Sequence, residues 1–191
     1  MKLVSNAIRD FYAGNVAAFF HDGVPIFDDI RSVLDEQFAR LRPLEQSILV
    51  WLAIAREPTS LHALHADLVP APSHATVLKA IRGLQRRSLL ETSSGGLALQ
   101  NVVIEYLTGR LIDQVCSELI SGTLDWVARY ALLKTNVKEY VRQSQVRLIV
   151  QPIAQRIAHQ LGADDMRPNF DGCWTSYAKR HGRRVMPPGI C

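Results

Sequence analysis

Apolar residues in the first third of the chain recur every three to four positions, which is the period of an α-helix. The pattern predicts one helix over residues 3–20 and a second over about 28–41. Pro43 suits the first turn of a third helix, which is apolar on almost every side and ends before Pro58. A helix of this kind is buried on most sides, so we expect it, with Trp51, to form the centre of the core.

Two shorter helices are predicted next, each preceded by a residue type that caps helices. Thr59 or Ser60 precedes a stretch reading LHALHADL, and Ser73 precedes a stretch that continues to about Arg87. The second of these helices carries an apolar stripe, formed by Val77, Leu78, Ile81 and Leu84. We expect this stripe to pack on the core.

After these helices the pattern changes to short segments typical of β-strands. Residues 88–92 and 97–100 predict two strands, and the Ser-Ser-Gly-Gly sequence between them suits a hairpin turn. A long helix is expected from about Asn101 to Ser121. A further helical stretch follows over about 124–160, and its Pro152 is expected to kink or break it.

This order of elements predicts a mainly α fold: a winged helix-turn-helix with a short β-hairpin wing, plus helical extensions. The hairpin is the discriminating feature, because a plain helical bundle contains none. The tail is expected to be disordered, since Gly, Pro, Asp and Arg dominate it. The predicted divisions are a helical lead-in (1–24), the winged-helix domain (25–122), a helical connector (123–160) and a divergent tail (161–191).

Composition narrows the class of protein. Hydrophobic residues make up 48% and charged residues 21%, which is globular composition. No run of 18 apolar residues exists, so we expect no membrane partner. Three cysteines, too few and too widely spaced for a disulfide framework, favour free thiols and a cytoplasmic location. The net charge is +4, but the tail alone contributes +2, which weakens any general argument for nucleic-acid binding.

Motifs for catalysis and cofactor binding are missing from the sequence. Only Lys134 among the lysines is followed by Thr, and no glycine loop precedes it, so there is no Walker A motif. His62 and His65 have no Cys or third His at ligand spacing, so no metal is expected. Cys116 lies among apolar helix positions, which favours a buried, inert thiol. We therefore expect no enzyme and no cofactor held by this chain alone.

One segment carries a concentrated charge. No acidic residue occurs between Asp67 and Glu91, and the helix within that interval has a basic face. In a winged helix this face could meet DNA phosphates or bases, or it could dock on an acidic protein domain or simply be solvated. The predicted wing tip has no Lys or Arg to grip DNA, which favours the non-DNA interpretations. The candidate binding residues are Lys79, Arg82, Arg86 and Arg87.

Longer stretches of the sequence resemble a known family. They read FDDIRSVLDEQFARLRPLEQSILVWLAIAREPTSLHALHADL, LKAIRGLQRRSLLE and LALQNVVIEYLTGRLIDQVCSEL. The sequence resembles the winged-helix region of bacterial STAND-type signalling NTPases, the NB-ARC proteins that carry WD repeats. KEYVRQSQVRLIV resembles the helical connector that follows this region. The resemblance covers roughly residues 3–157, and the tail departs from it.

The resemblance implies a fragment that lacks both the upstream NTPase domain, which binds ATP or ADP, and the downstream repeats. Family members often carry a Met-His-Asp motif after the wing, whose His approaches the nucleotide. The corresponding residues here are Leu99, Gln100 and Asn101. Gln100 is therefore a candidate nucleotide contact without a charge, or else a hydrogen-bonding strand end, with Asn101 capping the next helix.

Two functions follow as expectations. The leading one is a regulatory and interaction module of a STAND-type ATPase that docks on an NTPase domain, in cis or in trans, without catalysis of its own. The alternative is a DNA-binding winged-helix transcriptional regulator, which would use the four basic residues named above, with the cluster at 179–184 as an auxiliary contact.

Overall fold

The structure is a computed structural model, and it describes residues 25–134 and 137–161. The expected helix over 3–20 and the tail beyond residue 161 lie outside the described residues. The chain divides into two compact units, Met1–Thr108 and Gly109–Cys191, and the boundary falls inside one long helix.

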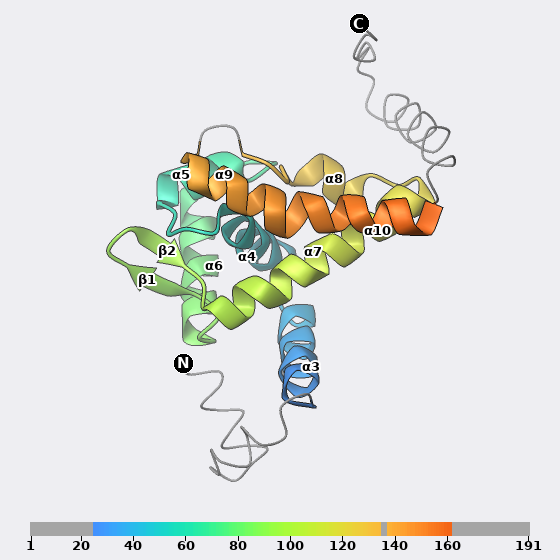
Figure 1. The fold of residues 1–191 in the computed structure, drawn as a ribbon. Helices are drawn as coiled ribbons and strands as arrows, with labels where there is room; N and C mark the ends of the chain where they lie inside the picture. The colour runs from blue at the N-terminus through green and yellow to red at the C-terminus, as the bar shows by residue number, and fades with distance from the viewer. Residues whose placement is uncertain (1–24, 135–136, 162–191) are drawn as a thin grey trace, which may run out of the picture. The chain divides into compact units, whose positions relative to one another are not determined.

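The first unit is helical with one small antiparallel sheet (Figure 1). Helix, short helix, helix and hairpin follow one another in the order of a winged helix-turn-helix, with the hairpin as the wing. The predicted mainly α fold with a β-hairpin is confirmed. The elements are α3 (Pro25–Ala39), α4 (Pro43–Ala55), α5 (Leu61–Asp67), α6 (His74–Arg86), β1 (Glu91–Ser93), β2 (Gly96–Ala98) and the start of α7 (Asn101–Ser121).

Helix α4 is the central element of this unit. Pro43 stands in its first turn, and every residue from Ile48 to Ala55 is buried, Trp51 with 6% of its surface exposed. α6 packs against α4 with a stripe of Val77, Ala80, Ile81 and Leu84. The expected place of Leu78 in that stripe was wrong: it is 41% exposed, because the i, i+3, i+4, i+7 spacing from Val77 selects Ala80 instead.

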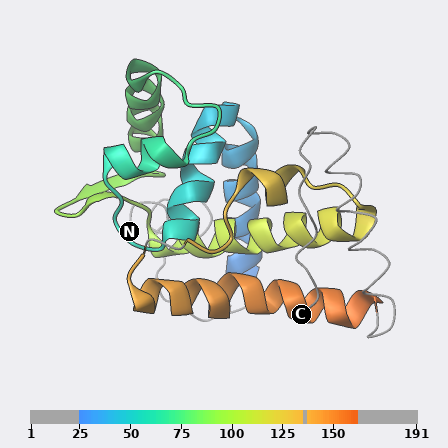
Figure 2. The same ribbon diagram turned by 90° about the horizontal axis from the view of Figure 1, so that it is seen from above.

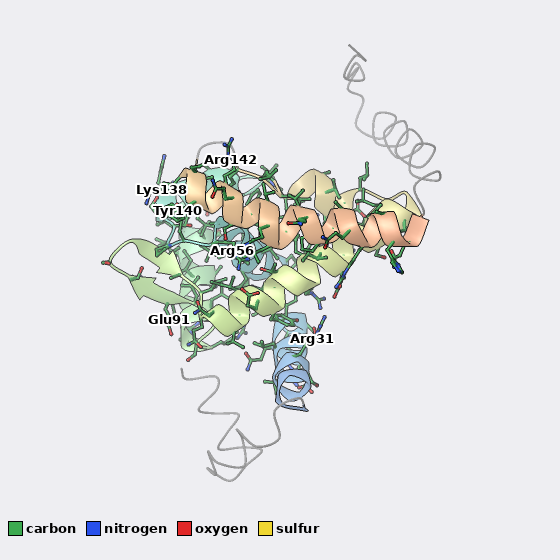
Figure 3. All side chains as sticks on the ribbon, in the orientation of Figure 1. Arg31, Arg56, Glu91, Lys138, Tyr140 and Arg142 are labelled. Atoms are coloured by element: carbon green, nitrogen blue, oxygen red, sulfur yellow. The ribbon has the colours of Figure 1, made fainter. Side chains whose placement is uncertain are left out.

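Arg56 ends α4 and ties it to α7 (Figure 3). Its backbone is left-handed, with φ of 56°, and its N–H still donates to the carbonyl of Leu52. The Arg56 side chain is only 10% exposed, and its guanidinium donates to Glu105 Oε1 at 2.8 Å and to Thr108 Oγ1 at 3.0 Å. Helix α4 therefore stops before Pro58 at a residue whose side chain is held by the first turns of α7.

The wing is shorter than the predicted hairpin, with strands at 91–93 and 96–98 in place of 88–92 and 97–100. Glu91 pairs with Ala98, and the strands are joined by a two-residue turn. The expected first strand over 88–92 was wrong at its start, because the N–H groups of Ser88 and Leu89 bond back to carbonyls at the end of α6. Those residues close the helix rather than begin a strand.

The loop before α5 anchors the wing. Leu97 and Thr59 exchange two backbone hydrogen bonds of 2.9 Å. Gly96, with φ of +125°, allows this approach, since a Cβ there would lie 2.5 Å from the Thr59 carbonyl oxygen. The hairpin therefore projects from the helices with a fixed base (Figure 1).

The second unit contains the rest of α7 and the helices that follow it, α8 (Asp125–Arg129), α9 (Glu139–Gln145), the π-helical η1 (Val146–Val150) and α10 (Gln151–Leu161). Arg156 of α10 forms an ion pair with Asp113 of α7, and Figure 2 shows these two helices side by side. Buried Glu118 accepts hydrogen bonds from the N–H groups of Trp126, at 2.8 Å, and Val127, at 3.3 Å, and so caps α8.

The helical stretch expected over about 124–160 is interrupted between Arg129 and Glu139. The expected break at Pro152 was wrong, because the helix continues through that residue. The π-helical segment ends at Val150, two residues before the proline, and the Gln151 N–H bonds to the Val146 carbonyl five residues back. This wider turn accommodates a residue that lacks an N–H and crowds the preceding turn. Among the described residues, no helix is both long enough and apolar enough to cross a membrane.

Trp51→Ala is predicted to lower the free energy of unfolding by about 3–5 kcal/mol, because it opens a large cavity in the most buried helix. Chemical denaturation of the full chain, followed by circular dichroism, measures the change. Tyr140→Ala is the matched control, since that ring is 60% exposed and its loss is expected to cost little. Equal effects of the two substitutions would contradict the central position of α4.

Candidate functional site

The basic face predicted on α6 is present and exposed. Ser73 caps the helix by accepting a hydrogen bond from the Thr76 N–H at 3.3 Å. Lys79, Arg82 and Arg86 are exposed on the side opposite the buried stripe. Within the described ranges none of these three forms an ion pair, so their charges are available to a partner.

Part of this face forms a pocket, here called the α4–α6 pocket. It has a volume of about 300 Å³ and lies between α6 and the beginning of α4. Lys79, Arg86 and Arg87 line it, and Arg82 does not. Arg42, just before α4, supplies a fourth cation. The complete lining is Arg42, Leu44, Glu45, Thr76, Lys79, Ala80, Gly83, Arg86 and Arg87.

Glu45 is the one acidic residue of the pocket, and it is 7% exposed. Its Oε2 accepts the backbone N–H of Arg42 at 2.9 Å and lies 3.4 Å from Nη1 of Arg87. Gly83 leaves room for this carboxylate, because a Cβ there would come within 2.7 Å of Oε1. The carboxylate is thus satisfied within the fold, and the pocket keeps a cationic excess.

Sequence reasoning missed Arg42 and Glu45 as parts of this site. They precede the start of α6 by about thirty positions, and only packing of α4 against α6 brings them to it. A signal for Glu45 did exist, since an acidic residue three positions after a helix start can bond back to the backbone there. It predicts a cap, but not the ion pair with Arg87.

Gln100 lies at the N-terminal end of α7, outside the α4–α6 pocket. Its carbonyl accepts the N–H groups of Val103 at 2.9 Å and Ile104 at 3.0 Å, so Gln100 rather than Asn101 holds the N-cap position. Its side-chain Nε2 donates to Glu91 Oε1 at 2.7 Å, beside the base of the wing (Figure 3). The remaining Oε1 is buried and has no partner within the described residues. Since phosphate oxygens need donors, this arrangement does not offer Gln100 to a nucleotide without rearrangement.

The histidines of the short helix lie apart from the basic face. His62 is exposed, while His65 bonds through Nε2 to the Pro72 carbonyl at 2.8 Å and stacks on His74 with ring centroids 4.1 Å apart. No group of three metal-ligating side chains occurs in the part of the chain that the structure describes.

Cys116 is buried in α7. Burial is the main cause that raises the pKa of its thiol above the ordinary value; nearby Arg156 opposes the shift and Asp113 adds to it. A raised pKa leaves less thiolate at any given pH, so the group is a poor nucleophile.

The fold and the site together define a winged-helix module with a cationic pocket between α6 and the beginning of α4. The chain is similar to the "Uncharacterized WD repeat-containing protein alr2800" of Nostoc sp. (strain PCC 7120), with 38% identity over 199 residues. The match covers 85% of this chain and 16% of the relative, so the chain spans about a sixth of that protein's length. No family model matches the chain. No solved structure matches it either.

The Cys116 thiol is predicted to react with a disulfide reagent at least about tenfold more slowly in the native protein than in denaturant. The measurement uses the Cys173→Ser, Cys191→Ser variant, which leaves Cys116 as the single thiol. Raising the pH is expected to speed the native reaction, because more thiolate forms. Equal rates in the native and denatured protein would show that the thiol is accessible and contradict the burial.

Proposed function

We propose that this chain is a regulatory and interaction module of a STAND-type signalling ATPase, which docks on a nucleotide-binding domain in the same chain or in a partner chain. The observation that carries the proposal is the basic face of α6, presented by a winged-helix module, whose Lys79, Arg82 and Arg86 form no ion pair with any other described residue. The chain is similar to a region of a WD repeat-containing protein. This similarity supports the proposal, because the family that the sequence resembles joins winged-helix modules to WD repeats.

In this proposal the module performs no catalysis, and ATP or ADP belongs to the domain on which it docks. The sequence lacks a phosphate-binding glycine loop with its lysine. Gln100, the residue at the family's nucleotide-contacting position, has its amide N–H engaged by Glu91. The proposed compartment is the cytoplasm, which suits three cysteines without a disulfide framework.

Titration calorimetry of the purified chain with Mg·ATP and with ADP is expected to show no binding at micromolar concentrations, because no element of the sequence cradles phosphates. The Nostoc relative offers the complementary observation: a Walker A motif is expected before its matched region. Micromolar nucleotide binding by this chain, or a relative without that motif, would contradict the proposal.

A DNA-binding regulator is the second candidate, favoured by the exposed row of Lys79, Arg82 and Arg86 on α6, the helix before the wing. The turn of the wing, Ser94 and Gly95, carries no cation, which counts against it.

A mobility-shift assay on random duplex at low salt tests the DNA candidate. If the protein is a DNA-binding regulator, binding falls steeply as salt rises, and alanine at Lys79, Arg82 or Arg86 weakens it to a similar extent. The assay is expected to show no binding of this kind. Salt-sensitive binding that all three substitutions weaken would favour the DNA regulator over the docking module.

A further inference from the structure

We propose that the α4–α6 pocket anchors a glutamate or aspartate side chain projecting from an acidic segment of a partner protein. This inference deepens the proposed function and rests on it: it names the chemistry by which the module recognises the domain on which it docks. Charge, shape and the state of Glu45 argue for it separately.

The charge of the pocket favours an anionic occupant. Four cationic side chains line it, and Glu45 forms an ion pair with one of them, Arg87. Lys79 and Arg86 have no ion pair within the described ranges, although they share one small concavity. Like charges gathered in this way repel one another until an anion enters, and guanidinium groups bind carboxylates with paired hydrogen bonds.

The shape of the pocket favours a protruding side chain over a nucleic-acid duplex. Three of the four basic residues on and beside α6 face one cavity of about 300 Å³, at the small end of ligand sites. A helix that enters a DNA groove presents a convex row of contacts, and Arg82, which such a row would include, lies outside the cavity. Leu44 and Ala80 supply apolar lining for the aliphatic stem of a glutamate.

Glu45 does not take the place of the proposed ligand. It is held back by the Arg42 N–H and by Arg87, in space that the missing Cβ of Gly83 leaves open. Its carboxylate therefore pairs with Arg87 and leaves Lys79 and Arg86, which form no ion pair within the described residues, for an incoming carboxylate.

The test measures binding of a fluorescein-labelled peptide of alternating alanine and glutamate to the full chain by anisotropy, near physiological ionic strength. Lys79→Ala and Arg86→Ala are each expected to weaken binding about three- to tenfold. Arg82→Ala is the matched control, since it removes the same charge from the same helix outside the pocket, and its effect is expected to stay below about twofold. Unchanged thermal unfolding of all three variants confirms that these exposed substitutions leave the fold intact.

Three results would overturn the inference. One is an equal loss from Arg82→Ala, which would show diffuse attraction rather than a pocket. Another is undiminished binding of the peptide with glutamine in place of glutamate. The third is stronger binding of random duplex than of the acidic peptide, which would assign the face to nucleic acid.

Different experimental results would contradict the pocket inference and the proposed docking function. The second probe is the segment that precedes the matched region of the Nostoc relative, where the proposed function expects the nucleotide-binding domain. If that domain binds this chain, and Lys79→Ala and Arg86→Ala leave the affinity unchanged, the pocket inference fails while the docking function survives. If the acidic peptide occupies the pocket and the domain does not bind, the proposed function fails instead.

Discussion

The burial of α4 on nearly every side is the constraint on which the first unit depends. A helix without a polar face cannot lie at a surface, so other elements must cover it. The buried stripe of α6 meets this need on one side. Both ends of α4 are then fixed by arginines: the backbone of Arg42 bonds to the Glu45 carboxylate, and the side chain of Arg56 is held by Glu105 and Thr108.

The candidate site is a consequence of that packing. Because α6 lies against α4 at Gly83, the carboxylate of Glu45 reaches both its own helix start and Arg87. One side chain thereby caps a helix, pairs with Arg87 and lines a cationic pocket. The exposed charges of Lys79 and Arg86 therefore line a concave surface, which an isolated basic helix would not form.

Predictions from local sequence were correct where a single residue type decides the backbone conformation. Pro43, Ser60 and Ser73 mark helix starts as the sequence predicts, and the long helix has the predicted bounds of Asn101 and Ser121. Such predictions were wrong where backbone N–H groups had alternative hydrogen-bond partners. The N–H groups of residues 88 and 89 bond to the preceding helix, and the helix passes Pro152 because a π turn takes up the missing bond.

The sequence by itself determined the helical pattern, the hairpin, the apolar character of α4 and the basic face of α6, because each is a property of neighbours along the chain. Only the tertiary structure decided that Arg42 and Glu45 join Lys79 and Arg86 in one pocket, that Arg82 stays outside the pocket, and that Gln100 turns its amide toward Glu91. These outcomes depend on how closely two helices pack and where a strand ends. Distances between residues far apart in sequence are set by the packing of side chains in the core and not by the periodicity of any one segment.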